Sequence, residues 1–196
     1  MKTIVTGGAG FIGSHLVEEL ISNGTEVHVL DNMISGQREY VHPHAIIHTE
    51  DICSAEAKKI IIREKPDVLF HLAAQADVGR SIHEPQYDAN VNINGTINIL
   101  EACHEISVKK LIFSSTSGVY GNLQKDLISE EDLTGPISYY GLSKLTAESY
   151  IRLFHQLYGL PYTILRYGNV YGPRQTAKGE GGVVAVFLDR IKKGMP

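Results

Sequence analysis

The segment Thr6-Gly7-Gly8-Ala9-Gly10-Phe11-Ile12-Gly13 follows an apolar stretch and opens a helical pattern, and it decides the fold of this chain. Its glycines are spaced G-x-x-G-x-x-G. Glycine permits the positive φ of a tight strand-to-helix turn and leaves room for a pyrophosphate beside the backbone. The free N–H groups of the helix N-terminus then attract phosphate oxygens. The segment therefore predicts a dinucleotide-binding turn.

Outward from this turn, strand-like and helix-like patterns alternate along the whole chain. Such alternation predicts a parallel sheet with helices on both faces, a Rossmann-like doubly wound α/β fold. The predicted strands are Lys2–Thr6, Glu26–Asp31, Ala45–Thr49, Asp67–Leu72, Lys110–Ser115 and Tyr162–Tyr167. Helices are expected in the gaps, with the clearest ones at Phe11–Asn23, after Ser54, and at Tyr87–Ile106, Ser138–Tyr158 and Val183–Lys193.

Asp31 ends the second predicted strand, eighteen residues beyond Gly13. A carboxylate at this place accepts hydrogen bonds from the hydroxyls of an adenosine ribose. It would also repel a 2′-phosphate. NAD is therefore expected as the cofactor rather than NADP.

The segment Tyr140-Gly141-Leu142-Ser143-Lys144 places a phenol and an ammonium one helical turn apart on the same face. A tyrosine that acts as a base near neutral pH needs its pKa lowered by about 3 units. A lysine beside it and the positive charge of a nicotinamide ring would both favour the phenolate. By itself the spacing is also compatible with a core tyrosine followed by a surface lysine.

Composition excludes several other classes of protein. The chain has 196 residues, 43% of them hydrophobic, and a net charge of -4, so it has no basic surplus for nucleic-acid binding. No apolar run approaches the roughly 20 residues that span a bilayer, and no secretory leader is recognisable. A cytoplasmic protein is expected. Cys53 and Cys103 lie far apart, and the histidines His42 and His44 are interpreted as part of a surface loop, so no metal is assigned.

Taken in order, several stretches resemble the extended short-chain dehydrogenase/reductase family, and within it the NAD-dependent epimerases and dehydratases that act on nucleotide sugars. The resemblance covers essentially the whole chain. It rests on Thr6–Leu16, Asp31-Asn32, Asp51-Ile52, His71–Gln75, Asn92 with Gly95-Thr96, Ser114–Gly121, Tyr140–Lys144 and Leu165–Arg174. It implies that residues 1–170 form the NAD-binding domain and that residues 171–196 begin the substrate-binding region.

The resemblance also implies roles for individual residues. Tyr140 is the expected catalytic base, Lys144 tunes it and contacts the nicotinamide ribose, and Thr116 occupies the family's Ser/Thr position. The substrate-binding residues are expected to be Thr116, Ser117, Tyr140 and Asn169. The cofactor-binding residues are expected to be Gly7, Gly10, Phe11, Ile12, Gly13, Asp31, Asn32, Asp51, Ile52, Leu72, Ala73, Ala74, Gln75, Asn92, Ser114, Tyr140, Lys144 and Tyr167.

Among the reactions of this family, 4-epimerisation of a UDP-sugar through a 4-keto intermediate is favoured. Dehydratases carry an Asp-Glu pair after the catalytic Thr, because eliminating water across C5 and C6 needs further acid–base groups. This chain has Ser117-Gly118 there. Related enzymes for uronic acids often have an extra arginine near Thr176, so a neutral hexose on UDP is expected, with UDP-glucose and UDP-galactose as the pair.

Two alternatives remain open from the sequence. One is other nucleotide-sugar chemistry with the same Tyr140–Lys144 pair, as in a keto-sugar reductase or a dehydratase. The other is a non-catalytic NAD-binding fragment, because family members continue well beyond this length and the chain is expected to lack part of the sugar pocket. By analogy, relatives pair as homodimers through the two long helices, here Tyr87–Ile106 and Ser138–Tyr158.

Overall fold

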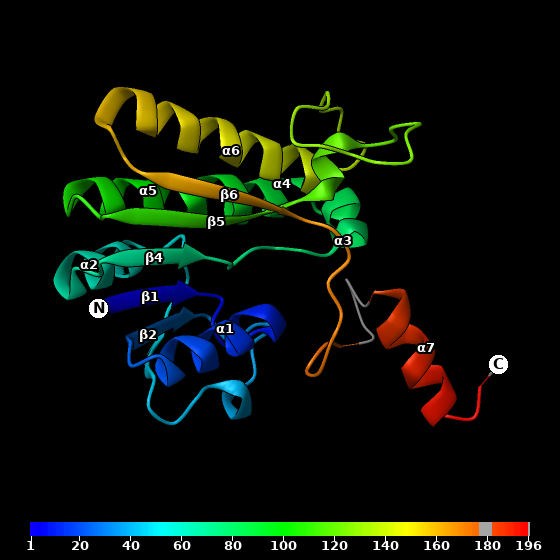
Figure 1. The fold of residues 1–196 in the computed structure, drawn as a ribbon, viewed down its shortest axis with the longest axis horizontal. Coiled ribbons are helices and arrows are strands. Elements are labelled where there is room, and N and C mark those ends of the chain that lie inside the picture. The colour runs from blue at the N-terminus through cyan, green and yellow to red at the C-terminus, as the bar shows by residue number, and fades with distance from the viewer. Residues whose placement is uncertain (177–181, 196) are drawn as a thin grey trace.

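The computed structural model describes residues 1–176 and 182–195 of the chain. A six-stranded parallel sheet in the order β3-β2-β1-β4-β5-β6 runs through its centre (Figure 1). The strands are β1 (Lys2–Thr6), β2 (Glu26–Asp31), β3 (Ile46–Thr49), β4 (Val68–His71), β5 (Lys110–Thr116) and β6 (Tyr162–Tyr167). All six predicted strands are confirmed to within a residue at each end. The order reverses between β1 and β4, where a doubly wound sheet opens its ligand crevice.

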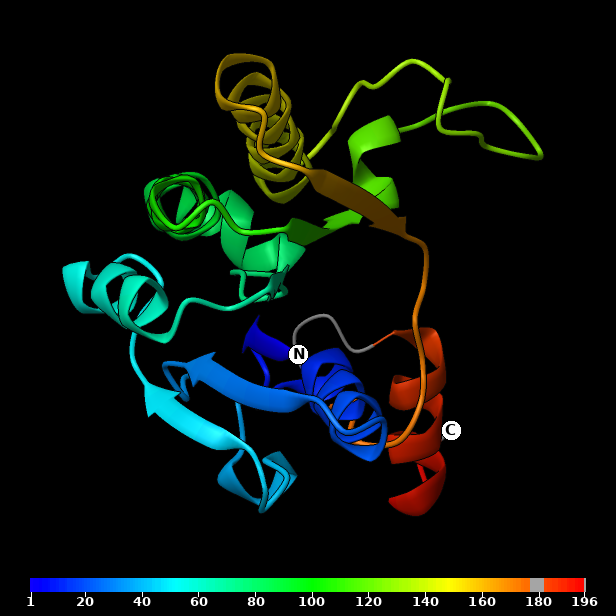
Figure 2. The ribbon, with the colours of Figure 1, turned by 60° about the vertical axis from the view of Figure 1, so that its left-hand side comes forward.

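Helices cover both faces of the sheet, as predicted. Figure 2 shows α2, α5 and α6 together on one side of the sheet and α1 on the other. These helices are α1 (Phe11–Ser22), α2 (Ala55–Glu64), α5 (Gly95–Glu105) and α6 (Tyr139–Tyr158). The expected cap of α2 is present, since the Ser54 hydroxyl accepts the N–H of Ala57 at 3.0 Å.

Two segments differ from the sequence-based expectation. The gap between β2 and β3 holds only a short 3-10 turn, η1 (Arg38–Tyr40), rather than a full helix. The helix expected at Tyr87–Ile106 is built from three pieces, α4 (Pro85–Ala89), the π-helical turn η2 (Asn90–Asn94) and α5. A further short helix, α3 (Val78–His83), was not predicted because it carries too few residues for a clear period.

The strands bury alternate side chains in two separate cores. On β1, Ile4 packs with Leu30 and the apolar residues of α2, α5 and α6, whereas Val5 packs with Val17 of α1. Alternate residues of a strand face opposite sides of the sheet, so a parallel sheet covered on both faces needs apolar residues throughout. Among the helices formed by residues 1–176 and 182–195, none has the length and apolar character required to cross a bilayer.

After β6 the chain returns across the sheet to α1. The ring of His15 on α1 is hydrogen-bonded to the carbonyl of Pro173 at 3.0 Å, and Arg174 forms an ion pair with Glu18 of α1. Helix α7 (Val183–Lys192) follows, and Figure 2 shows it on the α1 side of the molecule. Of the region expected at 171–196, residues 177–181 and 196 lie outside the described part.

His71, at the end of β4, joins three segments in the interior. One ring nitrogen lies 2.7 Å from the Thr6 hydroxyl of β1 and the other 3.0 Å from the Thr96 hydroxyl of α5. Burial, together with the nearby charge of Lys144, lowers the pKa of His71 to about 3. The ring is therefore neutral in the folded protein at any moderate pH.

This burial predicts a loss of stability in mild acid. Since the folded-state pKa lies below the ordinary value of 6.5, the unfolded chain takes up the proton first as the pH falls. The contribution is complete above about pH 6.5 and is lost progressively toward the folded-state pKa. Between pH 7 and about pH 5.5, His71 should remove about 1 kcal/mol from the free energy of unfolding.

Urea unfolding of the wild type and of His71→Gln at both pH values measures this effect. The variant is less stable throughout, but its stability should fall by about 1 kcal/mol less across this interval. Between pH 7 and pH 8, where the ring is neutral in both states, the two proteins should respond alike. Equal losses in acid would show that His71 is not the group responsible.

Candidate functional site

The glycine turn between β1 and α1 leaves no space for side chains. Gly7 has a φ of +70°, and a Cβ there would lie 2.7 Å from the backbone nitrogen of Ala73. A Cβ on Gly13 would lie 2.1 Å from the carbonyl oxygen of Gly7. These contacts explain two of the three glycines by steric necessity. The resulting bare backbone at a helix N-terminus is a cradle that fits a pyrophosphate.

The loop after β4 lies against this turn and is held there by Thr6. The Thr6 hydroxyl accepts the N–H groups of Leu72 at 3.2 Å and of Ala73 at 3.1 Å. The same hydroxyl meets His71, so one buried cluster orders both loops. Thus the expected residues Leu72–Gln75 come next to Gly7 at the carboxyl ends of neighbouring strands.

Carboxylates gather where β2 and β3 end. Asp31 is buried, and its carboxylate accepts the N–H groups of Ala9 at 3.0 Å and of Met33 at 2.9 Å. Asn32 donates to Asp51 at 2.8 Å. Burial of Asp51 opposes ionisation, but hydrogen bonds from the Cys53 backbone and from Asn32 hold its pKa below the usual value. The structure therefore brings Asp31, Asn32 and Asp51 together at the carboxyl ends of β2 and β3.

Asn92, expected at the cofactor, uses its side chain inside the protein. Its amide oxygen accepts the N–H of Gln75 at 2.9 Å. Its amide nitrogen donates to the Gln75 carbonyl, to Asp88 and to the Ser143 hydroxyl at 2.9, 3.1 and 3.0 Å. Asn92 lies in the π-helical turn η2 and so links the loop after β4 to helix α6. It positions the residues on either side of it.

The segments that carry Thr116 and Tyr140 meet where α6 begins. Thr116 ends β5, and its hydroxyl accepts the N–H of Gly118 at 3.0 Å, which starts the turn η3 (Ser117–Tyr120). Gly141, directly after Tyr140, lies so close to η3 that a Cβ would be 2.7 Å from the Gly118 carbonyl oxygen. The N-terminus of α6, which carries Tyr140, therefore packs on the turn that follows Thr116.

Lys144 lies one turn further along α6 and is buried, with 2% of its surface exposed. Its ammonium group is 4.4 Å from the centre of the Phe113 ring, a cation–π contact. The side chain is thus directed toward β5 and the sheet, not toward solvent. An ordinary surface lysine at this spacing is excluded by the burial.

A buried ion-pair cluster lies behind Tyr140 and Lys144. Glu148 of α6 is fully buried, accepts the Ser115 hydroxyl at 2.6 Å and pairs with Arg166 of β6 at 2.7 Å. Arg166 also donates to the Tyr120 hydroxyl at 2.9 Å. Its hydrogen bonds to Glu148, opposed by burial, raise the pKa of Arg166 above its usual value. The cluster fixes α6 to β5 and β6.

Four more of the expected residues lie on or just beyond β5 and β6. Ser114 donates to the His71 carbonyl at 3.2 Å, and Tyr167 is paired in register with Thr116 across β5 and β6. Burial raises the pKa of the Tyr167 phenol. Ser117 and Asn169 are exposed beyond the strand ends.

Several positioning residues were missed from the sequence, above all Glu148 and the Thr6–His71–Thr96 group. A signal for Glu148 existed, since it follows Lys144 by four residues and therefore shares its helix face. A carboxylate on the buried face of a helix needs a partner. Nothing in the local pattern indicates that the partner is Arg166.

Comparison with known proteins agrees with the fold. The model of the NAD dependent epimerase/dehydratase family matches residues 3–196. The putative UDP-glucose 4-epimerase of Methanocaldococcus jannaschii is 44% identical over 97% of this chain. The UDP-glucose 4-epimerase of Thermotoga maritima with UDP-glucose has a TM-score of 0.96 and 47% identity over 100% of the chain. That of Thermus thermophilus in complex with NAD has a TM-score of 0.95 and 45% identity, also over 100%.

The chain is shorter than these proteins. It spans 63% of the length of the M. jannaschii relative and 64% of each of the two solved structures. The matched part contains the sheet, the glycine turn and the Thr116, Tyr140 and Lys144 positions.

Removing the buried carboxylate of Glu148 should lower the free energy of unfolding of the protein. Glu148→Ala leaves Arg166 buried without its main partner, which costs about 3 kcal/mol in comparable buried pairs. Urea unfolding measures the loss. Glu105→Ala, at an exposed position of α5, is the matched control and should change stability by no more than about 0.5 kcal/mol. A cost for Glu148→Ala as small as that of the control would contradict a stabilising role for the cluster.

Proposed function

The chain belongs to the NAD dependent epimerase/dehydratase family, and from this premise we propose that the complete protein is an NAD-dependent 4-epimerase of UDP-hexoses. The proposed reaction interconverts UDP-glucose and UDP-galactose. The observation that carries the proposal is the packing of Gly141 on Gly118, which brings the start of α6 against the turn that follows Thr116, with Lys144 buried one helical turn beyond Tyr140. The names of the compared proteins support the choice of substrate.

The cofactor proposal rests on a fit between the crevice and a dinucleotide. Gly7, Gly10 and Gly13 would hold the pyrophosphate, because a Cβ on Gly7 or Gly13 would collide with nearby backbone. Asp31 would accept the ribose hydroxyls and exclude a 2′-phosphate. Asp51 and Ile52 would flank the adenine, and Lys144 would contact the nicotinamide ribose. The remaining residues proposed at the cofactor are Phe11, Ile12, Asn32, Leu72–Gln75, Asn92, Ser114, Tyr140 and Tyr167.

The chain's own residues supply the acid–base chemistry. A bound NAD would supply the redox chemistry, as the reversible acceptor of a hydride from C4 of the sugar, with inversion when the hydride goes back to the opposite face of the 4-keto sugar. Tyr140 would take the proton of the 4-hydroxyl and later give it back, and Thr116 would hydrogen-bond to the same oxygen. The positive charge of Lys144 would favour the phenolate. Asn169 and Ser117, exposed near the strand ends, would contact the substrate.

Epimerisation is favoured over elimination by the residues after Thr116. Ser117 and Gly118 begin the turn η3, and neither residue offers the carboxyl group that elimination of water uses as an acid–base group. A keto-sugar reductase uses the same Tyr140–Lys144 pair and is distinguished by stoichiometry. An epimerase needs only catalytic NAD, whereas a reductase consumes reduced cofactor mole for mole.

The complete protein, incubated with NAD and a panel of UDP-hexoses, tests the proposal. The anomeric proton signals in the NMR spectrum should show UDP-glucose and UDP-galactose interconverting. Absorbance of reduced nicotinamide should not change over many turnovers. Mole-for-mole consumption of reduced cofactor would identify a reductase, and absence of any product with NAD bound would identify a non-catalytic dinucleotide-binding protein.

Tyr140→Phe in the complete protein should lower kcat by about 1,000-fold, because the proton acceptor is lost. Affinity for NAD, measured by titration, should change little. Tyr139→Phe is the matched control, since Tyr139 is the adjacent, half-exposed residue at the start of α6, and this variant should retain activity. Equal activities for the two variants would remove Tyr140 from the reaction.

We also propose a cytoplasmic homodimer formed through the segments Tyr87–Ile106 and Ser138–Tyr158, with neither nucleic acid nor membrane as a partner. Helix α6 exposes apolar side chains at helical spacing on its outer face, namely Leu142, Tyr150, Leu153 and Leu157. Such a stripe on a long helix favours pairing with a second helix. The net charge of -4 supports the absence of a nucleic-acid partner.

The variant Leu153→Glu, Leu157→Glu should convert the complete protein from dimer to monomer, because two charges would enter the interface. Sedimentation equilibrium gives the mass. Leu127→Glu is the control, because Leu127 is even more exposed but lies in the loop between η3 and α6. A wild type that sediments with the mass of one chain would refute the dimer.

A further inference from the structure

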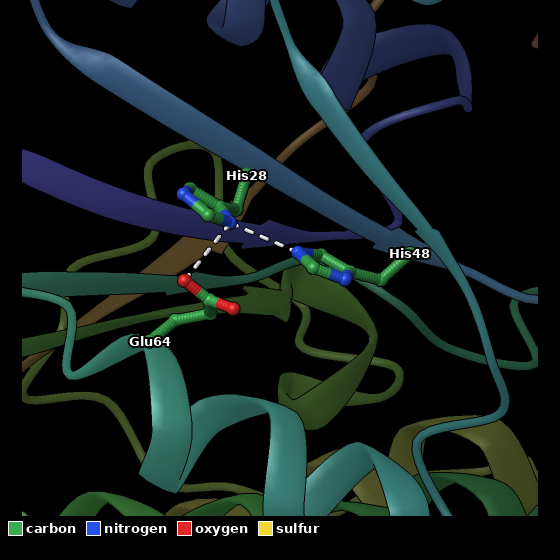
Figure 3. Close-up of side chains that lie close together, drawn as sticks. All are labelled: His28, His48 and Glu64. Atoms are coloured by element: carbon green, nitrogen blue, oxygen red, sulfur yellow. Dashed lines mark hydrogen bonds and ion pairs between the residues drawn. The ribbon is translucent and has the colours of Figure 1, made fainter.

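Two histidines and a glutamate converge on the sheet face beneath α2, outside the crevice. Figure 3 shows His28 of β2, His48 of β3 and Glu64 of α2 directed toward one another. The His28 Nδ1 and His48 Nε2 atoms are 2.9 Å apart, and the Glu64 carboxylate oxygen is 3.8 Å from His28 Nδ1. One ligand atom from each residue lies within 4.8 Å of the other two. His28 is buried, whereas His48 and Glu64 are partly exposed.

The hydrogen bonds of His28 direct a lone pair into this cluster. Its Nε2 lies 3.1 Å from a carboxylate oxygen of Glu26. A carboxylate only accepts, so in the neutral ring Nε2 carries the hydrogen and Nδ1 carries the lone pair. Carboxylates orient the histidine ligands of metal sites in the same way, by accepting the hydrogen of the second ring nitrogen. Glu26 therefore prepares His28 Nδ1 as a ligand.

We propose that His28 Nδ1, His48 Nε2 and a carboxylate oxygen of Glu64 bind a divalent transition-metal ion of the zinc class. Two imidazoles and a carboxylate suit this class, and a water molecule would complete a tetrahedron. Bonds of zinc length place two histidine nitrogens about 3.3 Å apart. The present separation of 2.9 Å is that of a hydrogen bond, in which a proton occupies the place of the metal. A small outward rotation of His48 opens the site.

The position of His48 makes this rotation feasible. Strand β3 is at the edge of the sheet, and the His48 ring is half-buried rather than enclosed. The bound ion would join β2, β3 and the end of α2. Because β3 pairs with β2 alone among the described strands, the ion would stabilise the edge of the sheet rather than take part in the proposed reaction.

Lys2 is the competing cation. Its ammonium group lies 3.2 Å from Glu26 and 3.5 Å from the same Glu64 oxygen that faces His28. Arg63 pairs with the other oxygen of Glu64 at 2.9 Å, so it does not compete for the oxygen that faces His28. A metal ion would have to displace Lys2 from Glu64, so removing the lysine charge should strengthen metal binding.

Titration of the tag-free protein with CoCl2 and ZnCl2 tests the site. Cobalt should bind with one equivalent and give the intense visible bands of tetrahedral coordination, and zinc should displace it. His48→Gln and Glu64→Gln each remove one of the three ligands and should each weaken metal binding by at least tenfold. Lys2→Met should bind more tightly, and it leaves all three ligands intact. Saturating zinc should raise the Tm of the wild type by about 4 °C or more.

The double variant His42→Gln, His44→Gln is the matched control. These two rings are 5.3 Å apart on the surface and could bind metal ions adventitiously. The control should keep both the cobalt spectrum and the zinc-dependent rise in Tm. The proposal is overturned if the wild type shows no tetrahedral spectrum, if the control abolishes binding, or if His48→Gln and Glu64→Gln bind like the wild type.

Discussion

Close approach of backbone to backbone is the constraint on which the functional crevice depends. It occurs where Gly13 lies on Gly7, where Gly7 lies on Ala73 and where Gly141 lies on Gly118. In each case a single methyl group would lie 2.7 Å or less from a backbone atom, which is closer than van der Waals contact allows. The first two contacts leave a turn without side chains at the N-terminus of α1, and the third brings helix α6 against the turn that follows β5. The glycine turn and the position of α6 thus depend on the same kind of contact.

Buried polar clusters keep these contacts in place. The Thr6–His71–Thr96 group orders the loop after β4, Asn92 connects that loop to α6, and Glu148 ties α6 to Arg166. A polar group without a partner is costly in the interior, so each cluster favours a single arrangement of the segments that it joins. Apolar packing alone would allow these segments to slide. Rigid placement of a proton acceptor and its partners within a few tenths of an ångström is what acid–base catalysis requires.

Strands β2 and β3 carry two polar clusters with different chemistry. Where the strands end, Asp31 and Asp51 accept backbone and amide N–H groups. On the sheet face under α2, His28 and His48 share a hydrogen bond beside Glu26 and Glu64. Because the two clusters share no residue, stability of the sheet edge and the proposed cofactor site are separable. The edge cluster can therefore be altered without touching the residues that surround the proposed cofactor.

The positions of the strands, the doubly wound fold and the glycine turn could all be predicted from the sequence, because apolar periodicity and glycine spacing are local properties. The sequence also placed Tyr140 and Lys144 on one helix face, since that relation needs only the helical repeat. Tertiary structure alone decided that Glu148 meets Arg166, that Asn92 turns inward to Gln75 and Ser143, and that His28 meets His48 and Glu64. These partners lie 16 to 51 residues apart, and their contact depends on which strands become neighbours and on which face each helix covers. No periodicity along the chain carries that information.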